Sequence, residues 1–396
     1  MVRSFLIILM KKQNRTRFLA GVYRRLLSAL PLISSLCILL PLFFLSCNGC
    51  ENPLSSRKPP QHFQLASWNL ETFFDGQETG TEYSDYTATS WDEVAYKSRL
   101  QSLGDALSCW PKPQTARDRA GPDIFALLEV ENATVLGDLL QGPFARFQYS
   151  YSAFATNPAS PLGLGLLSRF PIVRIRSHSL QTASFSSPRP MLEAEIELPD
   201  QSLILFVCHW KSKLGNLQET EAVRRASAGL INRRMIELKK EFPDVKLLFL
   251  VAGDLNENAD EFERQGGETL TALIPVGAYT AVFPEAASEP RPCIFLAGTS
   301  EKLSEASEEP AIFFCPWFRA AWQGSYAYQG AWETIDHILI SPAFFDDSGW
   351  EYTTFSVLDQ APFVNDTGYP NSFNPRTGKG LSDHLPIMAD FYQVQN

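Results

Sequence analysis

Acidic, amide and imidazole side chains stand at the ends of several short apolar segments of this sequence. These residues are Asn69, Glu71, Glu129, His209, Asp254, Asn256, Asp336, His337, Asp383 and His384. Polar side chains at the ends of neighbouring strands can gather at one edge of a sheet and converge on one pocket. Three of the five histidines of the chain belong to this set. The repeated placement therefore predicts one chemical site built from residues that are distant in the sequence.

The carboxylates of this set suit a divalent cation. Glu129, with Glu71 or Asp383 beside it, offers the hard oxygen ligands that Mg²⁺ or Mn²⁺ binds together with water and phosphate oxygens. Asp254 and Asn256 are two residues apart at the end of a predicted strand, so we expect both side chains to point the same way. One of them can deprotonate a water molecule while the other fixes its position.

The imidazoles add hydrogen-bond donors for a phosphate. His209 and His384 can each donate to phosphate oxygens, and Asp336 can hold one imidazole in a fixed tautomer and keep it charged. In-line phosphoryl transfer depends mainly on positioning and charge stabilisation, which these groups supply. His337 directly follows Asp336 on a predicted strand, so its side chain should point to the opposite face and pack in the core.

Short apolar segments bounded by Gly, Pro, Asn or Asp must position these residues. The predicted strands are residues 63–70, 124–130, 162–169, 190–198, 203–210, 246–256, 334–341 and 385–392. Residues 91–107 and 219–242 have the apolar spacing of helices. In the first of these helices the expected buried face consists of Val94, Leu100, Leu103 and Leu107. Many strands with few helices predict a single mixed α/β domain.

The N-terminal part of the chain has the pattern of an export signal. Residues 1–46 contain seven basic residues and no acidic one, and residues 26–46 are almost wholly apolar. The stretch FLSCNGC resembles a bacterial lipoprotein signal in which Cys47 carries the lipid, and an uncleaved membrane anchor of about 20 apolar residues is the alternative. We therefore expect a leader at 1–46, a flexible tether at 47–62, and a folded domain at 63–396 that is periplasmic or on the cell surface.

The charge of the chain limits the classes of partner. The formal net charge is -10, and removal of the seven basic residues of the leader takes it to -17. This acidity argues against tight, sequence-independent binding of nucleic acid, which depends on neutralisation of phosphates by Lys and Arg. It does not argue against an enzyme whose metal ion supplies the local positive charge.

Residues 257–333 are the irregular part of the domain, in which some local structure is expected. With Cys37 in the leader and Cys47 assigned to the lipid, the five remaining cysteines show no metal-type spacing such as CxxC…CxxC. In an oxidising compartment, Cys293 and Cys315 are the expected disulfide pair, because they flank one acidic loop. The aromatic segment 313–322, FFCPWFRAAW, is interpreted either as a core strand, which we favour, or as an exposed hairpin that inserts into lipid.

Six motifs carry a resemblance to a known family. They are ASWNLETF, ALLEVEN, CHWKSK, AGDLNE, IDHILIS and LSDHLPI, in this order between residues 63 and 392. In this order they resemble the endonuclease/exonuclease/phosphatase superfamily, the DNase I-like group. The resemblance implies a four-layered α/β sandwich, in which two packed mixed β-sheets are flanked by helices. It also implies a hydrolase that depends on Mg²⁺ or Mn²⁺.

The resemblance assigns a role to each matching residue. Glu129 is similar to the principal metal ligand, and Asn69, Glu71 and Asp383 are expected in or near the metal shell. The expected catalytic residues are His209, which contacts phosphate, Asp254 and Asn256, which orient water and phosphate, and the coupled pair Asp336 and His384. Arg189 matches a phosphate-contacting position more loosely, and Lys211 and Lys213 are either substrate contacts or solvated loop residues.

Three functions are compatible with this sequence. The first is an exported, membrane-anchored nuclease with DNA or RNA as its partner, because CHWKSKLG resembles the corresponding motif of bacterial extracellular nucleases. The second is a phosphatase or a sphingomyelinase-type phospholipase, which the acidic charge and the membrane location favour. The third is a surface binding protein without activity. The complete set of polar residues argues against this third function, because a binding module has no need to bury isolated charges.

Overall fold

The computed structural model describes residues 61–87, 90–111, 120–158, 160–180, 189–278, 291–305 and 310–394. The predicted leader, the predicted lipidation site Cys47 and all but the last two residues of the tether lie outside these ranges. Within them, no helix is long and apolar enough to cross a membrane.

Two mixed sheets and a short hairpin contain the strands. The six-stranded sheet has the order β15 (Trp350–Val357), β16 (Ile387–Gln393), β1 (His62–Phe73), β2 (Ile124–Val130), β4 (Gly163–Ser168) and β3 (Tyr151–Ala155). The eight-stranded sheet has the order β5 (Ile172–His178), β6 (Met191–Leu198), β7 (Gln201–His209), β8 (Leu248–Asp254), β14 (Asp336–Ile340), β11 (Ile312–Phe314), β10 (Ile294–Ala297) and β9 (Leu273–Pro275). The hairpin consists of β12 (Tyr326–Tyr328) and β13 (Ala331–Glu333).

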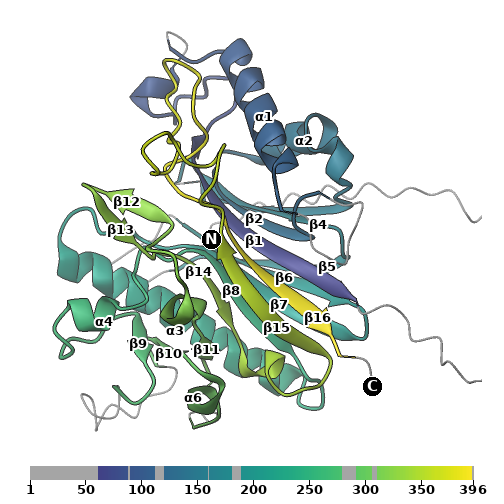
Figure 1. Cartoon of the computed structure of the whole chain (residues 1–396), viewed down its shortest axis with the longest axis vertical. Coiled ribbons are helices and arrows are strands. Elements are labelled where there is room, and N and C mark those ends of the chain that lie inside the picture. Colours follow the sequence, from purple (N-terminus) through teal and green to yellow (C-terminus); the bar gives the residue numbers. More distant parts are fainter. Residues whose placement is uncertain are drawn as a thin grey trace, which may run out of the picture. The chain divides into compact units, whose positions relative to one another are not determined.

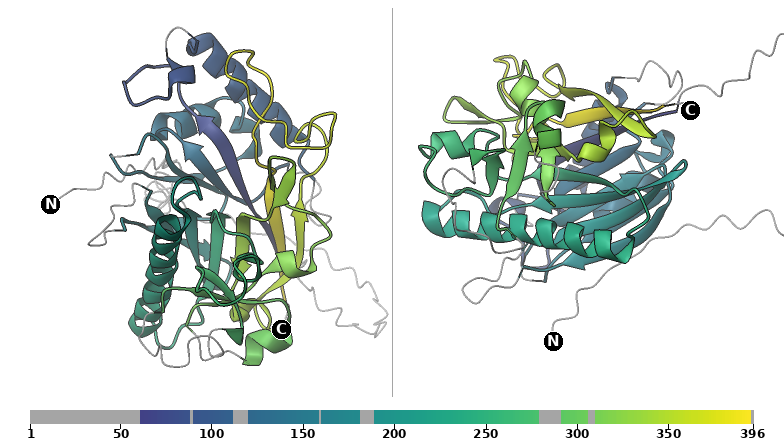
Figure 2. Two further views of the ribbon diagram at one scale, coloured as in Figure 1. Left: turned by 90° about the vertical axis from the view of Figure 1, so that its left-hand side faces the viewer. Right: turned by 90° about the horizontal axis from the view of Figure 1, so that it is seen from below.

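Helices flank the two sheets. They are α1 (Glu93–Ser108), α2 (Ala133–Gln141), α3 (Leu217–Glu241), α4 (Glu261–Arg264) and α6 (Ser300–Glu305), with short 3₁₀ helices at Ser84–Tyr86, Ala145–Phe147, Pro316–Arg319 and Pro342–Phe344. Figure 1 shows α1 and α2 beside the six-stranded sheet, and Figure 2 shows α3 running along the eight-stranded sheet. Because β1 also contacts β8 and β14 of the other sheet, the layers are helix, sheet, sheet and helix. The predicted four-layered α/β sandwich is confirmed.

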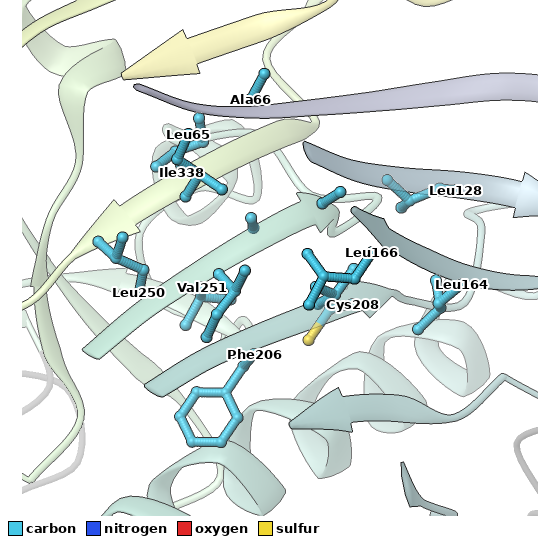
Figure 3. Close-up of a cluster of buried hydrophobic side chains, with 14 of the residues drawn as sticks. Leu65, Ala66, Leu128, Leu164, Leu166, Phe206, Cys208, Leu250, Val251 and Ile338 are labelled. Carbon is cyan, nitrogen blue, oxygen red and sulfur yellow. The ribbon is translucent and has the colours of Figure 1, made fainter. Parts of the chain in front are cut away.

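Apolar side chains from both sheets fill the space between them. Leu65 of β1, Leu128 of β2, Val251 of β8 and Ile338 of β14 belong to one buried cluster (Figure 3). Every residue of β8 is buried, as expected for a continuous apolar strand covered on both faces. Burial of this apolar surface is the main favourable term that holds the sheets together.

Two local predictions differ from the structure. Val94 is 75 % exposed, whereas Leu100, Leu103 and Leu107 of α1 are buried. Val94 precedes Leu100 by six residues, which places it about 120° away around the helix. Strand β8 ends at Asp254, so Asn256 lies beyond the strand with a φ of +50°, and the alternation of strand side chains does not apply to it.

The predicted disulfide between Cys293 and Cys315 is wrong. Both residues are buried thiols, one just before β10 and the other just after β11. These strands are parallel, with Phe295 beside Ile312 and Ala297 beside Phe314. The two cysteines therefore lie at opposite ends of the strand pair, about 15 Å apart, whereas a disulfide requires Cα atoms within about 7 Å.

Residues 257–333 were predicted to be irregular with some local structure. They contain the short strands β9, β10 and β11 of the eight-stranded sheet. Residues Phe313, Phe314 and Trp317 are buried in the core. The core interpretation is confirmed for residues 313–317, whereas Phe318 is exposed. The segment contains the end of β11 and a 3₁₀ helix, so the lipid-inserting hairpin is wrong for it.

A buried carboxylate on β6 is held by basic side chains. Glu193 accepts hydrogen bonds from Arg176 at 2.6 Å and from Arg234 at 2.8 Å, and His178 Nε2 lies 2.8 Å from its second oxygen. Burial acts to raise the pKa of Glu193, but the hydrogen bonds from His178, Arg234 and Arg176 outweigh it and lower the pKa to about 2.

Glu193→Gln is expected to reduce the free energy of unfolding by on the order of 2 kcal/mol at neutral pH. The folded-state pKa lies below the ordinary value of 4.5, so the stabilisation is fully present above that value and is lost as the pH falls toward 2. The difference between wild type and variant in urea unfolding should therefore shrink below about pH 4. An equal difference in acid and at neutral pH would contradict this account.

Candidate active site

Strand register brings together the ends of three strands in the eight-stranded sheet. His209 ends β7 and pairs in parallel with Asp254, which ends β8. Asp336 begins β14 and pairs with Asp254 from the other side in an antiparallel register. Gly253 permits the close approach of β7 and β8, because a Cβ at this position would lie 1.9 Å from the carbonyl oxygen of Cys208. Its φ of +138° is also a value that residues with side chains rarely adopt.

The six-stranded sheet supplies the carboxylate side of the site. Asn69 of β1 pairs with Leu128 of β2, which places Asn69 next to Glu129. Glu129 Oε1 accepts a hydrogen bond from Asn69 Nδ2 at 3.2 Å, and Oε2 accepts one from the Thr72 amide at 2.7 Å. Asn69 Nδ2 also donates to Asp254 Oδ2 at 3.2 Å. One amide group therefore links the carboxylates of the two sheets.

Glu71 points toward the long connection between β15 and β16. Its two oxygens accept hydrogen bonds from Ser372 Oγ at 2.7 Å and from the Phe373 amide at 2.6 Å. The buried Arg99 donates to the carbonyl oxygens of residues 70–72 behind it. Burial and the nearby charge of Asp383 raise the pKa of Glu71 to about 7.

Three residues of the site have a left-handed backbone. The φ angles are +53° at Glu71, +59° at Glu129 and +50° at Asn256. Such a conformation costs a residue with a side chain on the order of 1 kcal/mol or more, and the surrounding structure must impose it. Strain of this kind is typical of residues that are positioned for function.

The carboxylates Glu71, Glu129 and Asp383 are of the chemical type that binds a divalent cation. Burial and the charge of Glu129 raise the pKa of Asp383, and Asp383 in turn raises the pKa of Glu71. Three like charges thus lie close enough to disfavour one another, an arrangement that a bound cation relieves. Hard oxygen donors of this type match Mg²⁺ or Mn²⁺. Asn69 uses its amide to link Glu129 and Asp254, and its Oδ1 accepts from the Glu71 amide at 3.1 Å, so its place as a ligand stays a prediction.

Asp336 and His384 form a buried hydrogen-bonded pair. His384 Nδ1 lies 2.8 Å from Asp336 Oδ2, and Ser325 Oγ donates to the same oxygen at 2.6 Å. Burial alone would lower the pKa of His384, but the charges of Asp336 and Asp383 and the hydrogen bond raise it well above its ordinary value. His384 is therefore an imidazolium, and its Nε2 lies 4.0 Å from Asp254 Oδ2 and 3.9 Å from Asp383 Oδ1.

His209 has the opposite electrostatic environment. Its Nε2 lies 3.4 Å from Asp254 Oδ2 and 3.7 Å from Glu129 Oε1. Burial, together with the charges of Arg189 and His384, lowers the pKa of His209 well below its ordinary value, so this imidazole is neutral. Burial and the charge of Asp336 raise the pKa of Asp254 to about 7. One neutral imidazole, one charged imidazole and a carboxyl group poised near neutrality are suited to different roles in acid–base chemistry.

Asp254, Asp336 and His384 form a second possible donor set for a metal. One ligand atom from each lies within 4.8 Å of the others. The hydrogen bond between His384 Nδ1 and Asp336 already occupies two of these groups. This hydrogen bond favours a coupled acid–base pair at Asp336 and His384, and a cation held by Glu129, Glu71 and Asp383 stays a prediction.

The basic residues predicted to contact substrate have different surroundings. Arg189 donates to the Trp210 carbonyl at 2.6 Å, and Lys211 lies partly buried, which lowers its pKa. Lys213 forms ion pairs with Glu261 at 2.6 Å and Glu333 at 3.6 Å. Lys213 thus links the β12–β13 hairpin to α4, which leaves Lys211 as the lysine of this motif that is available to a substrate.

The structure places the remaining predicted residues as follows. The Asn256 amide donates to Asp254 Oδ1 at 2.8 Å, and Asn256 Nδ2 donates to the Trp210 carbonyl at 3.2 Å. His337 is fully buried, and its Nε2 lies 2.8 Å from the Glu257 carbonyl. The prediction that His337 packs in the core is confirmed.

Two residues of the hairpin segment contact the site and were not predicted. Ser325 donates to Asp336, and the ring of Tyr326 stacks on His384 with centroids 4.5 Å apart. Trp68 Nε1 donates to the His384 carbonyl at 2.9 Å. The sequence carries no local signal for these contacts, because the partners are far apart along the chain.

Comparison with known proteins covers the first four of the six motifs. A sequence profile described as Endonuclease/Exonuclease/phosphatase family matches residues 64–273, which is more than half of the chain. A search of curated proteins found no match.

Among solved structures, the chain is similar to an endonuclease/exonuclease/phosphatase family protein from Bacteroides thetaiotaomicron, with 14 % identity, 84 % of this chain and 96 % of that chain covered, and a TM-score of 0.46. It is similar to the human Nocturnin catalytic domain with 15 % identity, coverage of 84 % and 97 %, and a TM-score of 0.45. It is also similar to a mannosyl-6-phosphatase from Bacteroides thetaiotaomicron with 14 % identity, coverage of 83 % and 99 %, and a TM-score of 0.45. On the profile match, the chain belongs to the endonuclease/exonuclease/phosphatase family.

Proposed function

We propose that this chain is a divalent-metal-dependent phosphodiesterase that hydrolyses nucleic acid. The observation that carries the proposal is the convergence of the Asp336–His384 pair and Asp254 with the carboxylates Glu129 and Asp383. Members of this family are typically hydrolases of phosphoester bonds. The motif CHWKSKLG, which resembles that of bacterial extracellular nucleases, favours nucleic acid among the phosphoesters.

The side chains divide the work of hydrolysis. A divalent cation held by Glu129, Glu71 and Asp383 would neutralise phosphate charge and polarise the phosphorus–oxygen bond. Asp254, with a pKa of about 7, accepts a proton from the attacking water, which Asn256 orients. The charged His384 donates its Nε2–H to a phosphate oxygen, and the neutral His209 donates a further hydrogen bond. Asp336 keeps His384 charged and oriented.

A phosphatase or a sphingomyelinase-type phospholipase is the second candidate. The net charge of -17 without the leader and the ion pairs of Lys213 favour a substrate that needs few phosphate contacts. The two candidates differ in substrate but share the metal and the catalytic residues.

The full chain, purified in detergent, is expected to cleave single-stranded DNA or RNA in Mg²⁺ and to lose this activity in EDTA. Duplex DNA, inositol phosphates and sphingomyelin are tested in parallel, with restored Mg²⁺ as the control for irreversible loss. Cleavage of sphingomyelin or of an inositol phosphate, without cleavage of any nucleic acid, would transfer the proposal to the second candidate. Unchanged activity in EDTA would contradict the proposed dependence on a divalent metal.

The same proposal includes export and attachment to the membrane through a lipid on Cys47. The basic start, the apolar residues 26–46 and the stretch FLSCNGC support it. Labelled palmitate should enter the wild type and not Cys47→Ser, and the variant should keep its leader. Failure of palmitate to enter the wild type would contradict lipidation at Cys47 and favour the uncleaved anchor.

A further inference from the structure

A cavity of about 370 Å³ opens beside the proposed metal ligands. Its lining residues are Ala327, Gly330, Tyr369, Pro370, Ser372 and Asp383. The first two belong to the β12–β13 hairpin, and the others belong to the connection between β15 and β16 (Figure 1). Asp383 is both a lining residue and a proposed metal ligand. A phosphate bound at the metal would therefore lie next to the cavity, and another part of the same substrate molecule can occupy it.

Tyr369 is the aromatic residue of the cavity lining, and Trp332 contacts it from outside the lining. The rings of Trp332 and Tyr369 are stacked, with centroids 5.5 Å apart and an angle of 18° between the planes. Trp332 pairs across the hairpin with Ala327, so both side chains lie on the same face of the hairpin. Tyr369 lines the cavity and remains 38 % exposed despite the stacking. The Tyr369 ring offers a planar group an aromatic surface for contact.

Two small residues of the hairpin also line the cavity. Ala327 and Gly330 contribute little volume, and a Cβ at Gly330 would have no atom within 4 Å. A planar group can enter such a space without displacing side chains. The volume is within the range of pockets that bind small molecules.

The charge of the lining excludes a second anionic group. Its six residues include one carboxylate and neither lysine nor arginine. A further phosphate placed here would face Asp383 without a cation from the lining, at an electrostatic cost. The group that fits is therefore neutral and planar, not another phosphate.

We propose that this cavity binds one nucleoside of the phosphodiester substrate, with its base against the ring of Tyr369. The inference rests on the proposed phosphodiesterase function and narrows its substrate to unpaired nucleotides. A base in a duplex is stacked between its neighbours and must be unstacked before it can enter a protein pocket. Binding through one base also suits an acidic protein, since base stacking on aromatic side chains needs no phosphate neutralisation.

Chromogenic diesters test the assignment with the leaving group held constant. The 3′- and 5′-(4-nitrophenyl phosphate) esters of thymidine are compared with methyl 4-nitrophenyl phosphate in Mg²⁺. The measured quantity is the ratio of kcat/KM for the faster thymidine ester to kcat/KM for the methyl ester. Tyr369→Ala, which removes the aromatic ring, and Ala327→Trp, which fills the cavity, should each lower this ratio by on the order of tenfold. Tyr328→Ala, on the same hairpin but outside the lining, should leave the ratio unchanged.

The outcomes separate this inference from the proposed function. Hydrolysis of all the esters with the same ratio in every variant would overturn the nucleoside site and leave the phosphodiesterase standing. Absence of Mg²⁺-dependent hydrolysis of any ester would overturn the phosphodiesterase instead. Saturation-transfer NMR with thymidine in EDTA then tests the cavity without turnover. Transfer to the base protons should occur in wild type and Tyr328→Ala and be lost in Ala327→Trp, and its absence in wild type would overturn the site. Thermal unfolding of each variant controls for misfolding.

Discussion

Replacement of either Asp336 or His384 by alanine is expected to lower kcat by a factor on the order of 10² to 10⁴, the range of a lost acid–base partner. The two side chains are buried and joined by a hydrogen bond of 2.8 Å. Asp336→Ala removes the charge that keeps the pKa of His384 high, so the imidazole loses the proton that it donates. His384→Ala removes the donor itself.

The double variant distinguishes a coupled pair from two independent residues. Because residues that act as one unit are not additive, Asp336→Ala/His384→Ala should be little slower than the worse single variant. A rate loss equal to the product of the two single losses would show that the pair does not act as a unit. Thermal unfolding of all three variants is measured in parallel.

A matched control lies at the far end of β1. His62 Nε2 and Asp390 Oδ1 form a similar contact at 3.0 Å. His62→Ala removes an imidazole–carboxylate contact of nearly the same length, away from Asn69 and the site. It should change stability and leave kcat unaltered. A comparable fall in kcat in this variant would mean that general destabilisation, not lost chemistry, explains the effect at His384.

Glu129→Gln is expected to weaken the binding of Mg²⁺ or Mn²⁺ by a factor on the order of 10 to 100 or more. Mutation of a residue that only hydrogen-bonds to a metal ligand typically costs this much, and loss of a ligand should cost at least as much. The substitution removes a negative charge from the proposed cation site with little change in shape. The two Glu129 oxygens accept hydrogen bonds from Asn69 Nδ2 and from the Thr72 amide. In the glutamine variant the side-chain NH₂ group would face one of these donors and find no acceptor there. A stability loss of about 1 to 3 kcal/mol should therefore accompany the effect, the cost of an unsatisfied buried donor.

The measurements are a Mg²⁺ titration of activity and a direct Mn²⁺ titration followed by electron paramagnetic resonance. Glu131→Gln is the matched control, two residues further along the chain. Glu131 accepts from the Asp75 amide at 2.6 Å, and burial raises its pKa to about 7, so the neutral amide should be tolerated there. Identical metal titration curves for wild type and Glu129→Gln would remove Glu129 from the metal site.

The sequence by itself determined the chemical types at the ends of the strands. Apolar segments predicted strands at 203–210, 246–256 and 334–341 with His209, Asp254 and Asp336 near their ends. The structure has β7 and β8 ending, and β14 beginning, at these residues. This worked because a buried strand must be apolar, so a polar residue marks its limit locally. That His337 points to the face opposite Asp336 was also predictable from a local pattern, since side chains alternate along a strand.

Local patterns were insufficient where the chain leaves a regular element. Asn256 was expected to follow the alternation of β8, but the strand ends at Asp254 and the next residues turn with a positive φ. Val94 was expected on the buried face of α1 with Leu100, Leu103 and Leu107, but its position around the helix exposes it. Apolar character alone does not specify the direction in which a side chain points.

Only the tertiary structure decided which distant residues meet. Ser372 and Glu71 are 301 residues apart, and Cys293 and Cys315 lie at opposite ends of neighbouring strands. The contact of His384 with Asp336 was expected from the family resemblance and not from a local pattern. These relations depend on strand order and register, which are set by long-range pairing and by packing of the two sheets. The periodicity of a single segment carries no information on strand order or register. The cavity beside Asp383 likewise exists only because the hairpin and the β15–β16 connection fold against each other.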